Sequence, residues 1–153
     1  MLGKIPMIDN LKILLVEDDD VAAESVQRSL KKAGLDIPIV VAENGQVGLD
    51  VLRNQHPELR ITMPYVVLLD LNMPLMNGFE FLEQLRSDQH LCGVVVFVLT
   101  TSNAESDRTR AYHNNVAGYM VKAAVGPQFA KLASLLDAYQ NAVELQVSGS
   151  IVR

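Results

Sequence analysis

Residues 65–70 have the sequence YVVLLD, an apolar run that ends in the carboxylate of Asp70. A continuous run of β-branched and aliphatic residues is expected of a strand that is buried on both faces of a parallel sheet. The chain contains further runs of this kind on either side. They are residues 12–16 (KILLV), 37–42 (IPIVVA), 94–99 (VVVFVL) and 119–121 (YMV). The sequence therefore predicts five short, buried strands.

Segments with helical spacing of apolar residues separate these strands. The first three predicted helices cover residues 21–33, 46–53 and 79–85, and Gly34 stands where a helix C-cap belongs. Ser102 and Glu105 form a capping-box pattern, which predicts a fourth helix from Ser102 to about residue 114. Pro127 suits the first turn of a fifth helix. The apolar face of this helix would carry Phe129, Leu132, Leu136, Tyr139 and Val143.

Five repeats of strand followed by helix predict an α/β fold with a doubly wound, five-stranded parallel sheet, because crossovers between parallel strands are right-handed. A length of 153 residues suits one domain, since domains average roughly 150 residues. We assign this domain to residues 11–145. Residues 1–10 would form an N-terminal extension and residues 146–153 a flexible tail.

Composition excludes several classes of protein. The chain has 13 basic and 18 acidic residues and a net charge of −5, without the basic patch that nucleic-acid binding needs. Its single cysteine, Cys92, excludes an internal disulfide. The longest apolar run is too short to span a membrane, and residues 1–10 lack the features of a secretory signal. We therefore expect a cytoplasmic protein with no nucleic-acid or membrane partner.

Polar residues follow the predicted strands. Glu17 and Asp18 end the first, Asp70 the third, Thr100 the fourth and Lys122 the fifth. The carboxyl ends of parallel strands share one edge of the sheet, where ligands bind. Carboxylates that meet there either take up protons or bind a cation, and an all-oxygen ligand set suits Mg²⁺. Each group alone is also explained as a helix cap or a solvated charge, so the joint placement is what indicates a site.

Four motifs at these strand ends resemble the receiver domain of two-component response regulators. They are Val16-Glu-Asp-Asp, Leu68-Leu-Asp70-Leu-Asn-Met-Pro-Leu-Met-Asn-Gly78, Leu99-Thr-Thr-Ser102 and Gly118-Tyr-Met-Val-Lys122. Their order and spacing match the family over nearly the whole chain. The resemblance implies a flavodoxin-like (βα)5 fold with strand order 2-1-3-4-5.

The same resemblance implies a role for each polar residue. Asp70 corresponds to the phosphoacceptor, and Lys122 to the lysine that bonds a phosphoryl oxygen. Thr100 corresponds to the switch hydroxyl and Tyr119 to the switch aromatic residue. The Mg²⁺ site would consist of Glu17, Asp18, Asp70 and the backbone carbonyl of Asn72.

The function implied by the resemblance is that of a signalling protein and not an enzyme. It would accept a phosphoryl group from a sensor histidine kinase or a phosphotransfer protein. It would then signal by protein contact through the face built by helix four, strand five and helix five, which also offers a surface for a homodimer. No output domain follows Leu145 in the sequence, so we expect a stand-alone regulator.

Two residues depart from the family pattern. Ala123 stands where the family usually has a proline after a cis bond, and a cis bond before a non-proline residue costs about 2.5–4 kcal/mol. The loop is therefore either strained or trans, with a different position for Lys122. Thr101 is larger than the usual residue and would narrow access to the phosphoryl group. Thr100-Thr-Ser102 and the long segment 54–64 also resemble regulators paired with bacterial phytochrome kinases.

Two other functions fit the same sheet order. A Mg²⁺-dependent phosphohydrolase places a second aspartate two residues after its nucleophile as a general acid, but Asn72 occupies that position. A flavin-binding electron carrier cradles a phosphate in its first loop, where Glu17 and the following aspartates would repel it.

Overall fold

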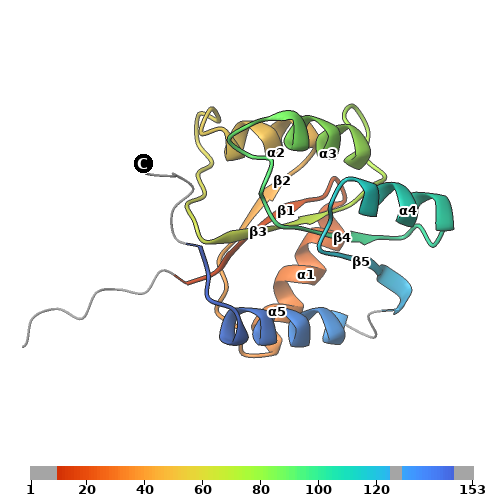
Figure 1. Cartoon of the computed structure of the whole chain (residues 1–153). Coiled ribbons are helices and arrows are strands. Elements are labelled where there is room, and N and C mark those ends of the chain that lie inside the picture. The colour runs from red at the N-terminus through yellow and green to blue at the C-terminus, as the bar shows by residue number, and fades with distance from the viewer. Residues whose placement is uncertain (1–9, 125–128, 147–153) are drawn as a thin grey trace, which may run out of the picture.

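The computed structural model describes residues 10–124 and 129–146 (Figure 1). Five parallel strands form one sheet in the order β2-β1-β3-β4-β5. The strands are β1 (Lys12–Val16), β2 (Ile39–Ala42), β3 (Tyr65–Leu69), β4 (Val96–Thr100) and β5 (Gly118–Val121). The predicted doubly wound fold and its strand order are confirmed.

Helices cover both faces of the sheet (Figure 1). They are α1 (Asp20–Lys32), α2 (Gly45–Leu52), α3 (Gly78–Ser87), α4 (Glu105–His113) and α5 (Ala130–Ala142), with a short 3-10 turn, η1 (Lys122–Ala124), after β5. The helices α1 and α5 pack on one face, and α2 and α3 pack on the other together with the buried Ala111 of α4. Each face therefore has its own hydrophobic core.

The central strands are apolar throughout because they supply both cores. In β1, Leu14 faces the core under α2 and α3, while Ile13 faces the core under α1 and α5. The strands β1 and β3 pair in a register that places Val16 opposite Leu69. The residues that follow, Glu17 and Asp70, therefore leave the sheet side by side.

Short polar residues and one glycine set the helix ends. Asp19 caps α1 by accepting hydrogen bonds from the first-turn amides, and Asn44 and Asn77 cap α2 and α3. Gly34 follows α1 with a φ of +78°, a left-handed conformation that glycine adopts without steric cost. The predicted stop after α1 is confirmed.

The predicted capping box at Ser102 is wrong. Helix α4 begins at Glu105, and Ala104 at its N-cap gives no side-chain cap. The Ser102 hydroxyl instead bonds the Asp107 carboxylate at 2.5 Å and accepts a hydrogen bond from the Ala104 amide. Ser102 lies two residues before the N-cap position, so the amide that it accepts from precedes the first turn of α4.

The fifth helix is shorter than predicted. It begins at Ala130, and Pro127 lies outside the described residues. Leu132 and Leu136 are buried as predicted, but Val143 follows the helix and is exposed. The proposed terminal extension and tail lie almost entirely outside the described residues, so these domain bounds stay predictions. Within the described part of the chain, no helix has the length and hydropathy needed to cross a membrane.

Candidate functional site

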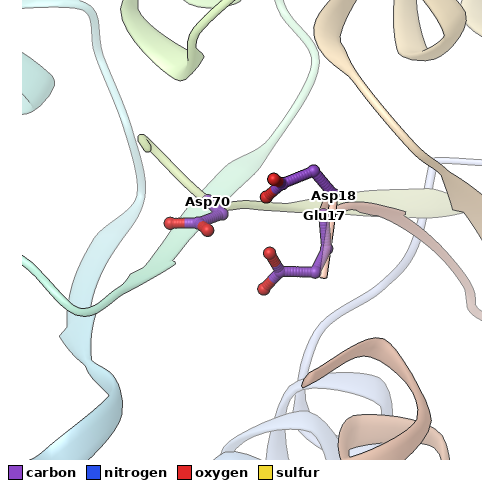
Figure 2. Close-up of side chains that lie close together, drawn as sticks. All are labelled: Glu17, Asp18 and Asp70. Carbon is purple, nitrogen blue, oxygen red and sulfur yellow. The ribbon is translucent and has the colours of Figure 1, made fainter. Parts of the chain in front are cut away.

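Three carboxylates meet where β1 and β3 end. Glu17, Asp18 and Asp70 each place an oxygen within 4.8 Å of the others (Figure 2). Figure 2 shows the side chains of Glu17 and Asp18 extending toward Asp70 from the adjacent strand end. Backbone hydrogen bonds hold both strand ends, from the Glu17 amide to the Ala42 carbonyl and from the Asp70 amide to the Val16 carbonyl, each 3.0 Å long. The predicted convergence is confirmed.

The three carboxylates differ in their exposure to solvent. Glu17 and Asp70 are buried, with 4% and 6% of their surface accessible, whereas Asp18 is exposed. The cluster therefore opens to solvent on the side of Asp18. A ligand or cation can reach the buried oxygens from that side.

Lys122 brings positive charge to the cluster from the end of β5. Its Nζ lies 2.6 Å from Glu17 Oε1 and 3.7 Å from Asp70 Oδ2. Within the described residues, the cis peptide bond is Met63–Pro64, so the Lys122–Ala123 bond is trans. Lys122 thus reaches the carboxylates without the proline that the family usually has after it.

One ammonium does not balance three carboxylates. The pKa of Glu17 is raised to about 7, chiefly by burial; the hydrogen bond from Lys122 lowers it, and neighbouring Asp70 raises it. A group of carboxylates with this excess of negative charge is neutralised by protons or by a cation. Hard divalent cations prefer oxygen ligands, so the donor set fits a divalent metal ion.

Asn72 and Thr101 lie beside Asp70. The Asn72 amide is 3.4 Å from Asp70 Oδ1, and its side-chain Nδ2 is 3.5 Å from Thr101 Oγ1. Both Asn72 and Thr101 are exposed at the rim of the cluster. The metal-binding role expected of the Asn72 carbonyl stays a prediction.

Thr100 and Tyr119 both bond Ser102, in the loop before α4. Thr100 is fully buried at the end of β4, and its hydroxyl accepts a hydrogen bond of 3.4 Å from the Ser102 amide. The half-buried Tyr119 donates its hydroxyl to the Ser102 carbonyl at 3.0 Å. This second contact was not predictable from the sequence, because any residue can supply a backbone carbonyl.

Gly78 fixes the backbone that carries Asp70. Its amide donates to the Leu71 carbonyl at 3.0 Å. A Cβ at position 78 would lie 2.6 Å from the Asp70 carbonyl oxygen and 2.7 Å from Leu71 Cα. The first turn of α3 therefore approaches the site more closely than any residue with a side chain allows.

The sequence pattern of one protein family, described as the response regulator receiver domain, matches residues 13–134. The chain belongs to this family. Receiver domains are phosphoacceptor signalling modules of two-component systems. This membership favours the receiver interpretation over a phosphohydrolase or a flavin carrier.

Several relatives are similar in sequence to this chain, over different shares of their own length. The chain is 38% identical over 114 residues to the probable methanogenesis regulatory protein FilR2 of Methanothrix harundinacea, covering 74% of this chain and 73% of that protein. It is 34% identical over 110 residues to the response regulator Rcp1 of Synechocystis, covering 72% and 75%. The nitrate/nitrite response regulator NarL of Escherichia coli is 37% identical, but the match covers only 47% of its length.

Solved structures show the same fold. The phosphorylated cyanobacterial phytochrome response regulator RcpA superposes with a TM-score of 0.77 at 27% identity, covering 90% of this chain and 99% of that one. The Mn²⁺-bound form of Rcp1 superposes with a TM-score of 0.75 at 28% identity, with the same coverage.

Proposed function

We propose that this protein accepts a phosphoryl group on Asp70 in a Mg²⁺-dependent reaction, from a sensor histidine kinase or a phosphotransfer protein. The observation that carries the proposal is the convergence of Glu17, Asp18 and Asp70 within 4.8 Å, with Lys122 bound to its edge. Membership of the receiver family supports the same reaction class.

The metal ligands in this proposal are the side chains of Glu17, Asp18 and Asp70 and the backbone carbonyl of Asn72. Bound Mg²⁺ supplies positive charge that offsets the repulsion between a carboxylate and an anionic phosphoryl donor. Asp18 is exposed and Glu17 is buried, so one ligand meets solvent and the other anchors the site in the fold.

Asp70 acts as the nucleophile because its carboxylate is held in position at the end of β3. One of its Oδ atoms attacks the phosphorus, the bond between phosphorus and the histidine nitrogen of the donor breaks, and the nitrogen keeps the electron pair. Such a transfer depends on positioning and charge stabilisation. Lys122, whose Nζ lies 3.7 Å from Asp70 Oδ2, is placed to bond an oxygen of the transferred group.

Thr100 and Tyr119 carry the signal in this proposal. The new phosphoryl oxygens attract the Thr100 hydroxyl, which now accepts a hydrogen bond from the Ser102 amide. Tyr119 holds the Ser102 carbonyl of the same loop, so a shift of that loop changes the position of Tyr119. Phosphorylation then shifts the population between two packings of the face formed by α4, β5 and α5. A downstream protein or a second copy of the chain would bind that face.

Two of the similar structures support a particular type of partner kinase. RcpA is a cyanobacterial phytochrome response regulator, and a further similar structure is the bacteriophytochrome response regulator RtBRR (TM-score 0.70, 32% identity). Together with Thr100-Thr-Ser102, this supports a phytochrome-type histidine kinase as the phosphoryl donor. Phosphotransfer from purified candidate kinases tests the assignment, and preferential transfer from a kinase of another type would contradict it.

Labelling by acetyl phosphate tests the proposed reaction without a partner. The parent protein is expected to be labelled in the presence of Mg²⁺ and to lose labelling when EDTA removes the metal. Asp70→Asn is expected to fold and to remain unlabelled. Asp36→Asn is the matched control, because Asp36 is an exposed aspartate outside the cluster. Equal labelling of Asp70→Asn and the parent would refute the proposal.

A further inference from the structure

Helix α4 buries very few apolar side chains. Of its residues from Glu105 to His113, only Ala111 is buried. A helix that is polar on nearly all sides gains little from the core, so other contacts must fix its position. Two arginines make these contacts, and both act on its C-terminal half.

Arg86 binds the C-terminal end of α4 from the last turn of α3. Its Nε donates to the Asn114 carbonyl at 2.7 Å, and its Nη2 donates to the Asn115 carbonyl at 3.0 Å. Its Nη1 donates to the carbonyls of Cys92 and Val94, at 2.8 and 2.7 Å. Asn114 and Asn115 directly follow the last residue of α4, His113, where the helix dipole gives partial negative charge, so a cation is stabilising there. One guanidinium thus joins α3, the segment before β4 and the end of α4.

Arg110 adds a second contact to α3 one turn earlier. Its guanidinium lies over the ring of Phe79, 4.2 Å from the ring centroid. Its Nη2 is also 3.7 Å from Glu83 Oε2. A cation over an aromatic face is attracted by the electrons of the ring. Arg110 therefore ties the C-terminal half of α4 to the first turn and the middle of α3.

The N-terminal end of α4 has a different kind of contact. Ala104 offers no side-chain cap, and the start of the helix is held by the bond between Ser102 and Asp107. Ser102 in turn bonds Thr100 and Tyr119. Within the described residues, the start of α4 is therefore attached to the strand ends near Asp70, and its end is attached to α3.

We propose that Arg86 and Arg110 are positioning residues that fix the C-terminal end of α4, so that a change at Asp70 moves the N-terminal half of the helix about a pivot at Asn114. The trigger in this proposal rests on phosphorylation of Asp70. The anchoring does not, because the contacts of both arginines exist in the unphosphorylated protein.

Amide hydrogen exchange, resolved by residue, tests the pivot. Phosphorylation with acetyl phosphate and Mg²⁺ is expected to change exchange in residues 105–110 and to leave residues 111–115 unchanged within about twofold, since local openings are set by local contacts. An equal change in both segments would overturn the pivot, because the whole helix would then move as one body.

The arginine variants test the anchoring in the unphosphorylated protein. Arg110→Gln is expected to speed exchange at residues 111–115 by about threefold, the effect of one exposed cation–π contact. Arg108→Gln is the matched control, because Arg108 is exposed on the same helix and its side chain makes no hydrogen bond or ion pair within the described part of the chain. Equal exchange in the two variants would overturn the role of Arg110.

Arg86→Lys tests the anchoring role of Arg86, because a lysine ammonium cannot reach all four carbonyls that the guanidinium binds. It is expected to speed exchange at residues 111–115 by about tenfold, and parent-like exchange there would overturn the role of Arg86. If Arg86→Lys does not fold, the Arg110 comparison still decides the proposal. If Asp70 takes up no label, the proposed function fails while the comparisons in unphosphorylated protein still test the anchor.

Discussion

Lys122 is the residue whose charge the carboxylate cluster needs in the absence of a metal ion. Its ammonium bonds Glu17 at 2.6 Å and lies 3.7 Å from Asp70. Its side chain is largely buried, so solvent screens these interactions only in part. The same group is placed to contact the phosphoryl oxygens once Asp70 is modified.

We predict that Lys122→Gln lowers the initial rate of labelling by acetyl phosphate about a hundredfold, because one preorganised donor to the transferring group is lost. Lys131→Gln is the control, since Lys131 is an exposed lysine on α5. The rate is measured with Mg²⁺ in excess. A rate within the error of that for Lys131→Gln would show that Lys122 serves only to neutralise Glu17.

At the scale of single residues, the sequence located the carboxylates but not the contacts of Ser102 at the start of α4. Glu17, Asp18 and Asp70 were predictable because each ends a strand whose apolar run is unmistakable. Ser102 was predicted to cap a helix. Its hydroxyl instead bonds Asp107, and its backbone carbonyl accepts a hydrogen bond from the Tyr119 hydroxyl. The cap prediction failed because α4 begins two residues later than the pattern indicated, and the exact start of a helix depends on distances that only the folded chain sets.

At the scale of elements, β1 and β3 were predicted to the residue, and β2 and β4 were not. Runs 12–16 and 65–69 match β1 and β3. The second and fourth runs begin two residues before β2 and β4. Ile37 is buried without strand pairing, and the Val94 amide bonds the Leu91 carbonyl of a turn. Apolar character marks burial, and hydrogen bonding decides where a strand starts.

The junction of β3 and α3 gives a prediction at this scale. Gly78→Ala is expected to lower the free energy of unfolding by about 1–3 kcal/mol, because the new methyl group overlaps backbone atoms of Asp70 and Leu71. Gly93→Ala is the matched control, since a Cβ there meets nothing within 4 Å, and its effect is expected to stay within about 0.5 kcal/mol. Denaturant unfolding measures both. Equal stability of the two variants would show that α3 can shift away from the site at no cost.

At the scale of the whole molecule, a metal ion bound only by the folded state is expected to stabilise it. The ligands come from β1 and β3, so an unfolded chain does not hold them together. With Mg²⁺ at about 100 times its dissociation constant, the expected gain is about 2.7 kcal/mol, seen as a higher midpoint of thermal unfolding.

Asp18→Asn is predicted to remove most of this stabilisation by Mg²⁺ while leaving the metal-free protein stable, because Asp18 is exposed. Asp20→Asn is the control, since it changes the charge next to the cluster without removing one of its three carboxylates. A midpoint that rises with Mg²⁺ equally in both variants would place the metal elsewhere.

The measurement that tests the account most directly is the mass and position of the group added by acetyl phosphate. Intact-mass analysis followed by peptide mapping is expected to find one phosphoryl group, on Asp70, formed with Mg²⁺ and absent with EDTA. A phosphoryl group on another residue, or undiminished labelling without the metal, would contradict the assignment of Asp70 and its carboxylate cluster.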